Sequence, residues 1–478
     1  MPSCTRFFAA ASVTVVDGAE NCSRDFARNV AEMKTLQGDE QPFFVMNPGR
    51  VAAAVDNWFT MLPRVAPFYS LRCNDDPVMV RLLAADPRVG FLAVTREELD
   101  TAVAAVEPGR VLYANPLWTR GSLRNAVSAG VNFLTVQAAS DLDRVSATAP
   151  NASLVLQIAV AGSTSELGAA PADVPAIFER AFDLGLDLCG LTVDLGSGRH
   201  NVSAYTTALR SAAELFNIGS QLGLKMDLLN LGGGFASAGS SFCEAASAIN
   251  AGLDALFPSN IRVIAQPGRF FAADAFTLVT RIIGKREADL STVTEDDFDA
   301  GTQAFVYQIN EGFYGSFGCR LVANVEPSCS PLFDGSLTTD GYADRRFYGS
   351  VVGPTDDAFD VAQPLCHLRQ MAVGDWLEWP AMGAYSRGNR ASLGDVDIPI
   401  PAVYYHCNAA EWRHLERCAS DECATSPAGL ASTAMSLFDE ADTDTIDDGF
   451  CGSNSDLSCS DGSAEEVWLA DWHQYQLV

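Results

Sequence analysis

Short apolar runs alternate with amphipathic segments along the first half of the chain. The runs are brief enough for strands, whereas the segments between them carry apolar residues at helical spacing. Strands are expected at Ser12–Val16, Phe43–Met46, Phe68–Leu71, Gly90–Ala93, Val111–Tyr113, Phe133–Val136, Leu154–Ile158, Gly190–Val193, Leu228–Leu231 and Arg262–Ala265. Helices are expected at Phe26–Met33, Val51–Met61, Pro77–Ala84, Arg96–Ala105, Ser122–Ala129, Ala172–Leu184 and Ala204–Leu222. This alternation predicts βα units that close into a (β/α)8 barrel.

The pattern changes at about Phe276, where helical spacing becomes scarce. Strand-like runs with Gly, Pro and Tyr follow at Phe305–Asn310, Arg346–Val352, Trp376–Trp379 and Ala402–His406. They predict a second, mainly antiparallel β domain. We therefore expect an N-terminal strand and helix over residues 1–40 that pack on the β domain, the barrel over 41–275 and the β domain itself over 276–417.

The two ends of the chain need separate interpretation. The apolar start has the length of a short signal peptide, but polar residues alternate into it and no small-residue cleavage site stands out, so a strand is favoured. Residues 418–478 contain 13 Asp and Glu and no Lys or Arg, which predicts a largely disordered acidic tail. Its aromatic end, Val467–Tyr475, is either a docking segment or an unstructured terminus.

Charge and cysteine content limit the class of protein. The net charge of −29 and the lack of a basic stripe argue against nucleic acid or an anionic membrane as partners. No apolar run is long enough to span a bilayer. The 13 cysteines show no CxxC spacing, so we expect reduced thiols, no metal site and a cytoplasmic location.

Three consecutive glycines, Gly232–Gly234, follow the expected strand Leu228–Leu231. Without a Cβ, backbone N–H groups there could approach a phosphate, and late strands of such barrels commonly carry a phosphate site. A tight strand–helix turn would show the same residues. Both interpretations stay open on the glycines alone.

Several segments together are far more specific. They are Pro67–Asn74, Tyr113–Pro116, Leu228–Phe235, Ala265–Ala272, Asn310–Phe317, Gly353–Asp357, Val373–Trp376 and Met382–Tyr385. In this order and spacing they resemble eukaryotic ornithine decarboxylase and the antizyme inhibitors, over roughly residues 10–410. The resemblance implies fold type III of the pyridoxal-phosphate (PLP) enzymes, an α/β barrel followed by a β domain, in agreement with the pattern.

The resemblance also implies that the covalent anchor of PLP is missing. The family's motif Pro-Phe-Tyr-x-x-Lys-Cys-Asn carries the lysine that condenses with the coenzyme, and Arg72 stands at that position. A lysine can reach its neutral, nucleophilic state, whereas a guanidinium stays protonated. Only Lys34, Lys225 and Lys285 exist in the chain, and none lies at an expected strand end of the barrel. We therefore expect no covalently bound cofactor.

Other family positions are changed as well. The histidine that stacks on the PLP ring falls at Asp194, and the glutamate that pairs with the ring nitrogen falls at Gln266. An arginine and an acid expected nearby are Gln157 and Leu92, and one substrate-binding acid aligns with Ala323. The catalytic cysteine, which the family contributes across its dimer, is Asp356, and its acidic neighbour remains as Asp357.

The family's phosphate-binding residues survive. They are Ser197, Gly232, Gly233, Gly234, Arg269 and Tyr385, called here the phosphate cradle. They persist either for the shape of the loop alone or because PLP or another phosphate-bearing ligand binds there without a covalent bond.

These substitutions predict a degenerate family member that is not an enzyme, a binding or regulatory protein of polyamine metabolism. It would resemble an antizyme inhibitor, or a prozyme that pairs with a catalytic ornithine decarboxylase paralogue. The alternative is a decarboxylase of a basic amino acid with altered chemistry around Asp194, Asp356 and Asp357, in putrescine biosynthesis.

The residues expected at the surface give limited support to binding of antizyme or of a second subunit. The segment that would face antizyme, Arg120–Arg144, is lysine-rich in the family but keeps few basic residues here, so an ordinary solvated helix is favoured. A family lysine–aspartate bridge between subunits becomes Glu166 facing Asp360, and two like charges repel. We therefore expect a weakened or absent homodimer.

Overall fold

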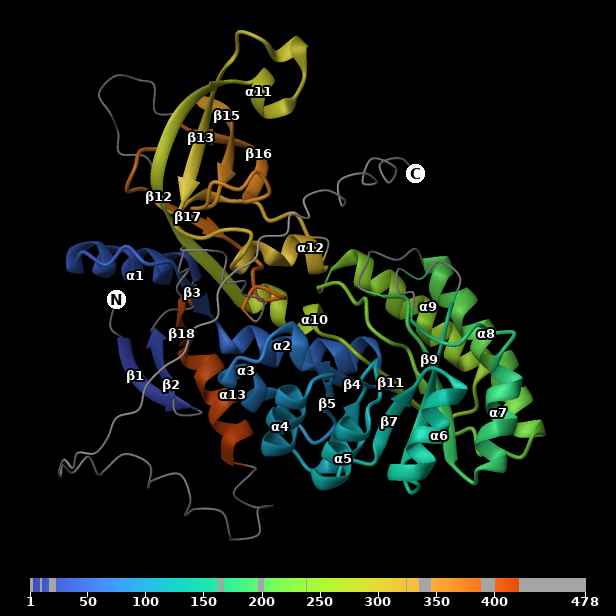
Figure 1. Ribbon diagram of the computed structural model, residues 1–478. Helices are drawn as coiled ribbons and strands as arrows, with labels where there is room; N and C mark the ends of the chain where they lie inside the picture. Colours follow the sequence, from blue (N-terminus) through green and yellow to red (C-terminus); the bar gives the residue numbers. More distant parts are fainter. Residues whose placement is uncertain are drawn as a thin grey trace, which may run out of the picture. The chain divides into compact units, whose positions relative to one another are not determined.

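The computed structural model describes residues 3–8, 11–16, 23–160, 163, 167–196, 202–237, 239–323, 325–334, 345–387 and 400–420. All of them belong to one compact unit, Met1–Thr425. Within these residues the chain forms a closed barrel of parallel strands and a separate ten-stranded mixed sheet (Figure 1). The predicted fold class, a (β/α)8 barrel followed by a β domain, is confirmed. The predicted acidic tail from residue 421 on lies outside the described residues.

The barrel closes in the order β10-β11-β4-β5-β6-β7-β8-β9. Its strands are β4 (Val65–Ser70), β5 (Gly90–Ala93), β6 (Val111–Tyr113), β7 (Phe133–Val136), β8 (Ser153–Ile158), β9 (Asp187–Val193), β10 (Leu228–Asn230) and β11 (Arg262–Ala265). Both faces of such strands are covered, one by the barrel interior and one by helices, which explains why they read as continuous apolar runs. The interior is packed by a cluster that includes Phe68, Leu92, Leu112, Val155 and Ile264. Within the described barrel the interior is filled, so a ligand of the barrel itself would bind at one of its two ends.

Helices follow the barrel strands around its outside (Figure 1). They are α2 (Pro48–Met61), α3 (Pro77–Ala85), α4 (Arg96–Ala105), α5 (Arg120–Ser128), α6 (Ala139–Thr148), α7 (Val174–Asp183), α8 (Val202–Gln221), α9 (Ser240–Leu256) and the short α10 (Arg269–Ala272). Local sequence fixes several of their starts. Asn47 caps α2 and Asp76 caps α3, each directly before a proline, and Thr95 with Glu98 forms a capping box on α4.

The second sheet runs β1-β2-β18-β3-β12-β13-β15-β16, with β17 paired to β12 and to β14. Its strands are β1 (Ser3–Phe8), β2 (Ala11–Val16), β3 (Phe43–Met46), β12 (Phe276–Asp289), β13 (Gln303–Ile309), β14 (Ser330–Pro331), β15 (Arg346–Val352), β16 (Val361–Arg369), β17 (Trp376–Trp379) and β18 (Ala402–Asn408). The accompanying helices are α1 (Ser23–Gln37), α11 (Ser291–Thr294), α12 (Cys319–Ala323) and α13 (Ala409–Ser420).

Two features of this sheet differ from the sequence expectation. β13 pairs with β15 in parallel, and β18 is parallel to both β2 and β3, so the mainly antiparallel sheet also contains parallel pairs that the sequence did not predict. β3 lies in the range expected for the barrel, yet it pairs with β12 and β18 in this sheet. An apolar run indicates that a strand is buried, but it does not show which strand pairs with it. The expected domain boundaries stay a prediction.

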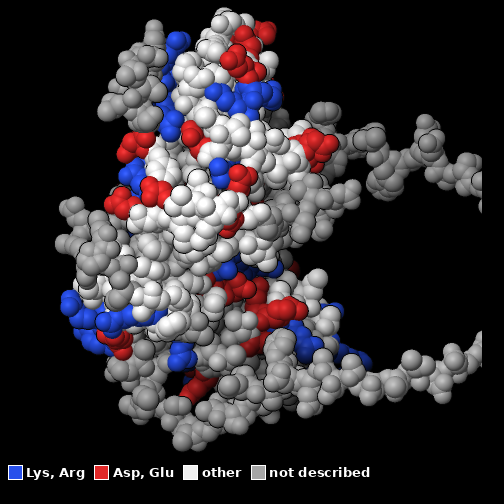
Figure 2. Space-filling view, turned by 90° about the vertical axis from the view of Figure 1, so that its left-hand side faces the viewer, with Lys and Arg blue, Asp and Glu red and all other residues white. Residues whose placement is uncertain are grey.

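Surface features agree with the composition. Basic and acidic side chains lie in small groups of both signs on the face shown in Figure 2, and no basic stripe crosses its coloured part. Among the described residues no helix is both long and apolar enough to cross a membrane. The seven cysteines for which the structure gives a bonding state (Cys73, Cys189, Cys243, Cys319, Cys329, Cys366 and Cys407) are all free thiols.

Candidate functional site

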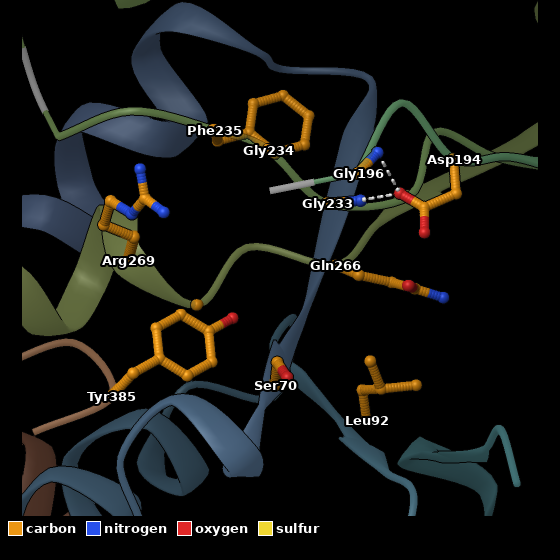
Figure 3. A pocket seen from close by; sticks show the side chains of 11 residues that line it. Ser70, Leu92, Asp194, Gly196, Gly233, Gly234, Phe235, Gln266, Arg269 and Tyr385 are labelled. Carbon is orange, nitrogen blue, oxygen red and sulfur yellow. Dashed lines mark hydrogen bonds between the residues drawn. The ribbon is translucent and has the colours of Figure 1, made fainter. Parts of the chain in front are cut away.

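A cavity of about 320 Å³ lies at the carboxyl ends of the barrel strands. Five strands supply its wall where they end: Ser70 of β4, Leu92 of β5, Asp194 after β9, Gly233 after β10 and Gln266 after β11. Arg269 and Tyr385 complete it (Figure 3). Active sites of (β/α)8 barrels are built at this end from the loops after the strands. A second cavity, of about 610 Å³, opens among strand starts at Asp187 and Arg262, the end of such barrels that serves stability.

The structure of the glycine loop, Gly232–Gly234, distinguishes glycines that the shape of the loop requires from a glycine that leaves room for a ligand. Gly232 and Gly234 have φ angles of +66° and +85°, and a Cβ on Gly232 would lie 2.5 Å from the Asp194 Cα. These two glycines are required by the fold. Gly233 has no such constraint, because the nearest atom to an added Cβ would be 3.5 Å away, an ordinary contact. Gly233 faces the cavity, so a side chain there would fill ligand space rather than break the loop.

Asp194 lies against this loop instead of standing free as a ring-stacking group. Its Oδ1 accepts hydrogen bonds from the backbone N–H groups of Gly233, at 3.1 Å, and Gly196, at 3.0 Å. Figure 3 shows the carboxylate on the side of the cavity opposite Arg269. A fixed anion therefore occupies the family position of a histidine.

Two side chains of the phosphate cradle, the Arg269 guanidinium and the Tyr385 phenol, line the cavity. Arg269 is the first residue of α10, in the segment that follows β11, and its guanidinium lies at one side of the cavity (Figure 3). Tyr385 comes from the distant loop after β17, with an uncommon φ of +59°. Burial raises the pKa of the Tyr385 phenol far above its ordinary value, so the hydroxyl stays protonated and able to donate a hydrogen bond.

Three contacts hold the Tyr385 loop against the end of β4. The Tyr385 N–H donates to the Cys73 carbonyl at 2.8 Å, and the Asn74 amide donates to the Gly383 carbonyl at 2.8 Å. The Arg387 guanidinium pairs with the fully buried carboxylate of Asp76. The loop thus places a side chain from the second domain at the mouth of the barrel.

Arg72, at the position of the family's lysine, does not line the cavity. It lies in the turn after β4, its side chain is 55% exposed, and its Nε is 4.0 Å from the Glu98 carboxylate. The other degenerate positions are also placed. Gln157 is buried and lies 3.5 Å from Gln137, whereas Leu92 and Gln266 line the cavity.

Asp356 and Asp357 are not part of this cavity. Asp356 is exposed. Asp357 accepts hydrogen bonds from the Tyr314 hydroxyl, at 2.7 Å, and from the Phe359 N–H, at 2.8 Å, and the Tyr314 bond is the main reason that the Asp357 pKa is lowered. The structure therefore does not bring these acids together with Asp194 within one chain. Ser197, Glu166 and the surroundings of the Ala323 side chain lie outside the described residues.

Asp360, expected to face Glu166 of another subunit, is directed into its own chain. It is 1% exposed and accepts hydrogen bonds from the Phe313 N–H, at 2.7 Å, and from the N–H and hydroxyl of Thr355, at 3.0 and 2.6 Å. Its carboxylate is satisfied internally. The weakened homodimer stays a prediction, without support from this residue.

Sequence reasoning missed four residues of the cavity wall: Ser70, Gly196, Phe235 and Gly268. Ser70, Phe235 and Gly268 are within motifs that carried the family resemblance, so the signal was present. At Gly268 a Cβ would lie 2.7 Å from the Cys73 Cβ, which reflects close packing of β11 on β4.

Comparison with known proteins agrees with this architecture. Residues 48–273 match the pyridoxal binding domain of the pyridoxal-dependent decarboxylases. The ornithine decarboxylase of Panagrellus redivivus is 33% identical over 426 residues, which cover 86% of this chain and 96% of that protein. The chain belongs to the ornithine decarboxylase family.

Two further relatives show the breadth of this family. Antizyme inhibitor 2 of Xenopus laevis is 32% identical, over 82% of this chain and 87% of that protein. The solved arginine decarboxylase of Paramecium bursaria Chlorella virus, bound to agmatine, is 26% identical with a TM-score of 0.71, over 80% of this chain and all of that one.

These relatives correct one expectation. The substitutions at Arg72, Asp194 and Gln266 led to the prediction that the chain is not an enzyme. That prediction is contradicted, because relatives at 33–35% identity are named ornithine decarboxylase and the similar solved structure is an arginine decarboxylase. The substitutions at Arg72, Asp194 and Gln266 are differences between this site and the site of the family, and they do not decide whether the protein is an enzyme.

Proposed function

We propose that the chain binds PLP, or a related phosphate-bearing ligand, without a covalent bond in the cavity at the barrel mouth, and acts in polyamine metabolism through that site. The observation that carries the proposal is the meeting of Gly233, Arg269 and Tyr385 around one cavity. They come from the loop after β10, from α10 and from the second domain, so their meeting depends on the whole fold.

The residues present fit one part of PLP better than another. Arg269, the backbone of the glycine loop and the neutral Tyr385 hydroxyl would hold the phosphate, a task suited to a guanidinium and N–H donors. The Gln266 amide would meet the ring nitrogen as a neutral hydrogen-bonding group. When bound, PLP supplies an electron-withdrawing ring to an amino-acid substrate. The residues do not fit covalent attachment, since Arg72 is neither an amine nor in the cavity wall.

The proposal is tested by titrating the purified chain with PLP, followed by gel filtration in ligand-free buffer. Binding should saturate with one ligand per chain, and the ligand should be lost on filtration. Any release of carbon dioxide from ornithine, lysine or arginine should depend on ligand kept in the buffer. Saturable binding that survives denaturation would contradict the non-covalent mode, and no binding would reject the proposal.

A second candidate function is binding of antizyme, supported by the similarity to antizyme inhibitor 2 of Xenopus laevis. The corresponding surface is α5 and α6. Asp141 there pairs with Arg144 at 3.1 Å and Asp143 with Arg180 at 2.7 Å, so both acids are paired within the chain. Pull-down with purified antizyme tests this candidate directly. A mixed sample with a catalytic ornithine decarboxylase tests the prozyme-like alternative.

A further inference from the structure

The cavity at the barrel mouth contains one fixed charge of each sign. Among the described residues that line it, Asp194 and Arg269 are the charged ones. They lie on opposite sides in Figure 3, with the glycine loop and Gln266 between them. A ligand that fills the cavity therefore contacts a cation at one end and an anion at the other.

Asp194 is held as a rigid part of the wall. Its Oδ1 accepts both N–H groups, from Gly233 and Gly196, while Oδ2 points away from the loop (Figure 3). Rotation of the Asp194 carboxylate away from an entering anion would break both hydrogen bonds. The carboxylate also uses the Gly233 N–H, a donor that a phosphate would otherwise share.

This arrangement disfavours a ligand whose only charged group is a phosphate. A phosphate monoester carries about −1.5 to −2 charges at neutral pH, and one arginine compensates only part of that. The fixed carboxylate adds repulsion, which is strongest where solvent is excluded. A positive group on the ligand, beside Asp194, would remove the repulsion and gain a charge-assisted hydrogen bond.

We propose that this site selects phosphate monoesters that also carry a protonated amine, with Arg269 at the phosphate and Asp194 at the amine. This inference rests on the proposed function and specifies its ligand class. An aldehyde has only an acceptor oxygen and finds no donor in the Asp194 carboxylate. Because Arg72 replaces the lysine that would condense with an aldehyde, the site gains nothing from that group either. Among ligands of the pyridoxal type, the amine form is therefore preferred.

The test compares ligands that differ in one group. Pyridoxamine 5′-phosphate, pyridoxine 5′-phosphate and inorganic phosphate are titrated calorimetrically into the full chain and into the Asp194→Asn variant. Asparagine keeps an oxygen that can accept from both loop N–H groups, so the variant removes charge while preserving the loop. In the natural chain the amine should bind about tenfold more tightly than the alcohol, the size expected for a hydrogen bond to a charged group.

The Asp194→Asn variant should lose this preference and bind pyridoxine 5′-phosphate more tightly than the natural chain does. Equal affinities for amine and alcohol in the natural chain would overturn the inference while leaving the proposed function standing. No binding of either ester would overturn both. If the variant fails to fold, N-acetylpyridoxamine 5′-phosphate gives the same answer with the natural chain. Acetylation removes the positive charge and should abolish the preference, and unchanged affinity would overturn the inference.

Discussion

The carboxylate of Asp76 and the guanidinium of Arg387 form an ion pair that joins the barrel to the loop of Tyr385. Asp76 caps α3 through the N–H groups of Val78 and Met79, and it also accepts the Tyr405 hydroxyl at 2.9 Å. One buried carboxylate thus links the end of β4, the loop after β17 and the strand β18. Neither partner lines the cavity, yet together they position a residue that does.

Replacement of Arg387 by methionine should destabilise the fold and weaken ligand binding together. Removing one partner leaves the Asp76 carboxylate buried without its cation, which costs about 3–5 kcal/mol in such pairs. The free energy of unfolding in urea measures this loss. Asp76→Asn in the same background should recover part of it, because asparagine still caps α3 without a charge. An additive double variant would contradict coupling between the two residues.

Replacement of Arg269 by methionine should weaken binding of a phosphate-bearing ligand about tenfold or more, since a charged hydrogen bond contributes about 1.5–3 kcal/mol. Equilibrium dialysis with pyridoxamine 5′-phosphate measures the change. Arg180→Met is the matched control, because Arg180 lies on α7 and pairs with Asp143 at the surface. The control should bind like the natural chain. Equal losses in both variants would show that overall charge, not the cavity, governs affinity.

Replacement of Arg72 by lysine should restore covalent attachment of PLP. The residue lies in the turn directly after β4, and a lysine there provides an amine that can become neutral. After borohydride reduction, mass spectrometry should find the pyridoxyl group on the peptide that contains residue 72. Arg72→Gln, which also removes the guanidinium, should give no such product. Labelling of Lys34, Lys225 or Lys285 alone would show that the turn does not present the side chain to the ligand.

His406 should make the fold sensitive to mild acid. Burial lowers its pKa from 6.5 to about 4, with Arg50 as a smaller cause. The unfolded chain takes up a proton near pH 6.5 and the folded chain does not, so stability falls as the pH drops from about 6.5 to about 4. The loss from this residue is about 2–3 kcal/mol by pH 4.5.

The measurement for His406 is the free energy of unfolding at pH 7 and at pH 4.5. The His406→Gln variant should lose less stability over this interval than the natural chain, although its stability at pH 7 will be lower because the stacking on Phe26 is gone. Equal losses in the two proteins would show that carboxylates alone cause the acid sensitivity.

Much of the barrel could be predicted because buried parallel strands leave a local signal. The bounds of β5, β6, β7 and β11 follow from apolar runs alone. Strand partners leave no such signal, so the apolar run at Phe43–Met46 does not reveal that β3 pairs outside the barrel. β16 gives no clear strand signal, because Pro364 and His367 interrupt its apolar pattern and partly exposed positions tolerate them.

The candidate site was predictable where residues follow strand ends. Gly233, Gln266 and Arg269 could be placed at the barrel mouth from the strand pattern and the family resemblance. The hydrogen bonds from the glycine loop to Asp194 could not, because they depend on how two loops from different strands approach each other. The grouping of Asp194 with Asp356 and Asp357 stays a prediction, since the last two are carried by the second domain and do not line the cavity of the same chain.

The position of β18 between β2 and β3 has a consequence for biosynthesis. The ribosome synthesises β18 (residues 402–408) long after β2 and β3. β18 nevertheless lies between these two strands and pairs with both in parallel. A nascent chain that has not yet reached β18 leaves the facing edges of β2 and β3 unpaired, and such edges are sites for association with other chains. A product that ends before residue 402 would be open to aggregation, because among the described strands β18 is the one that joins β1 and β2 to the rest of the sheet.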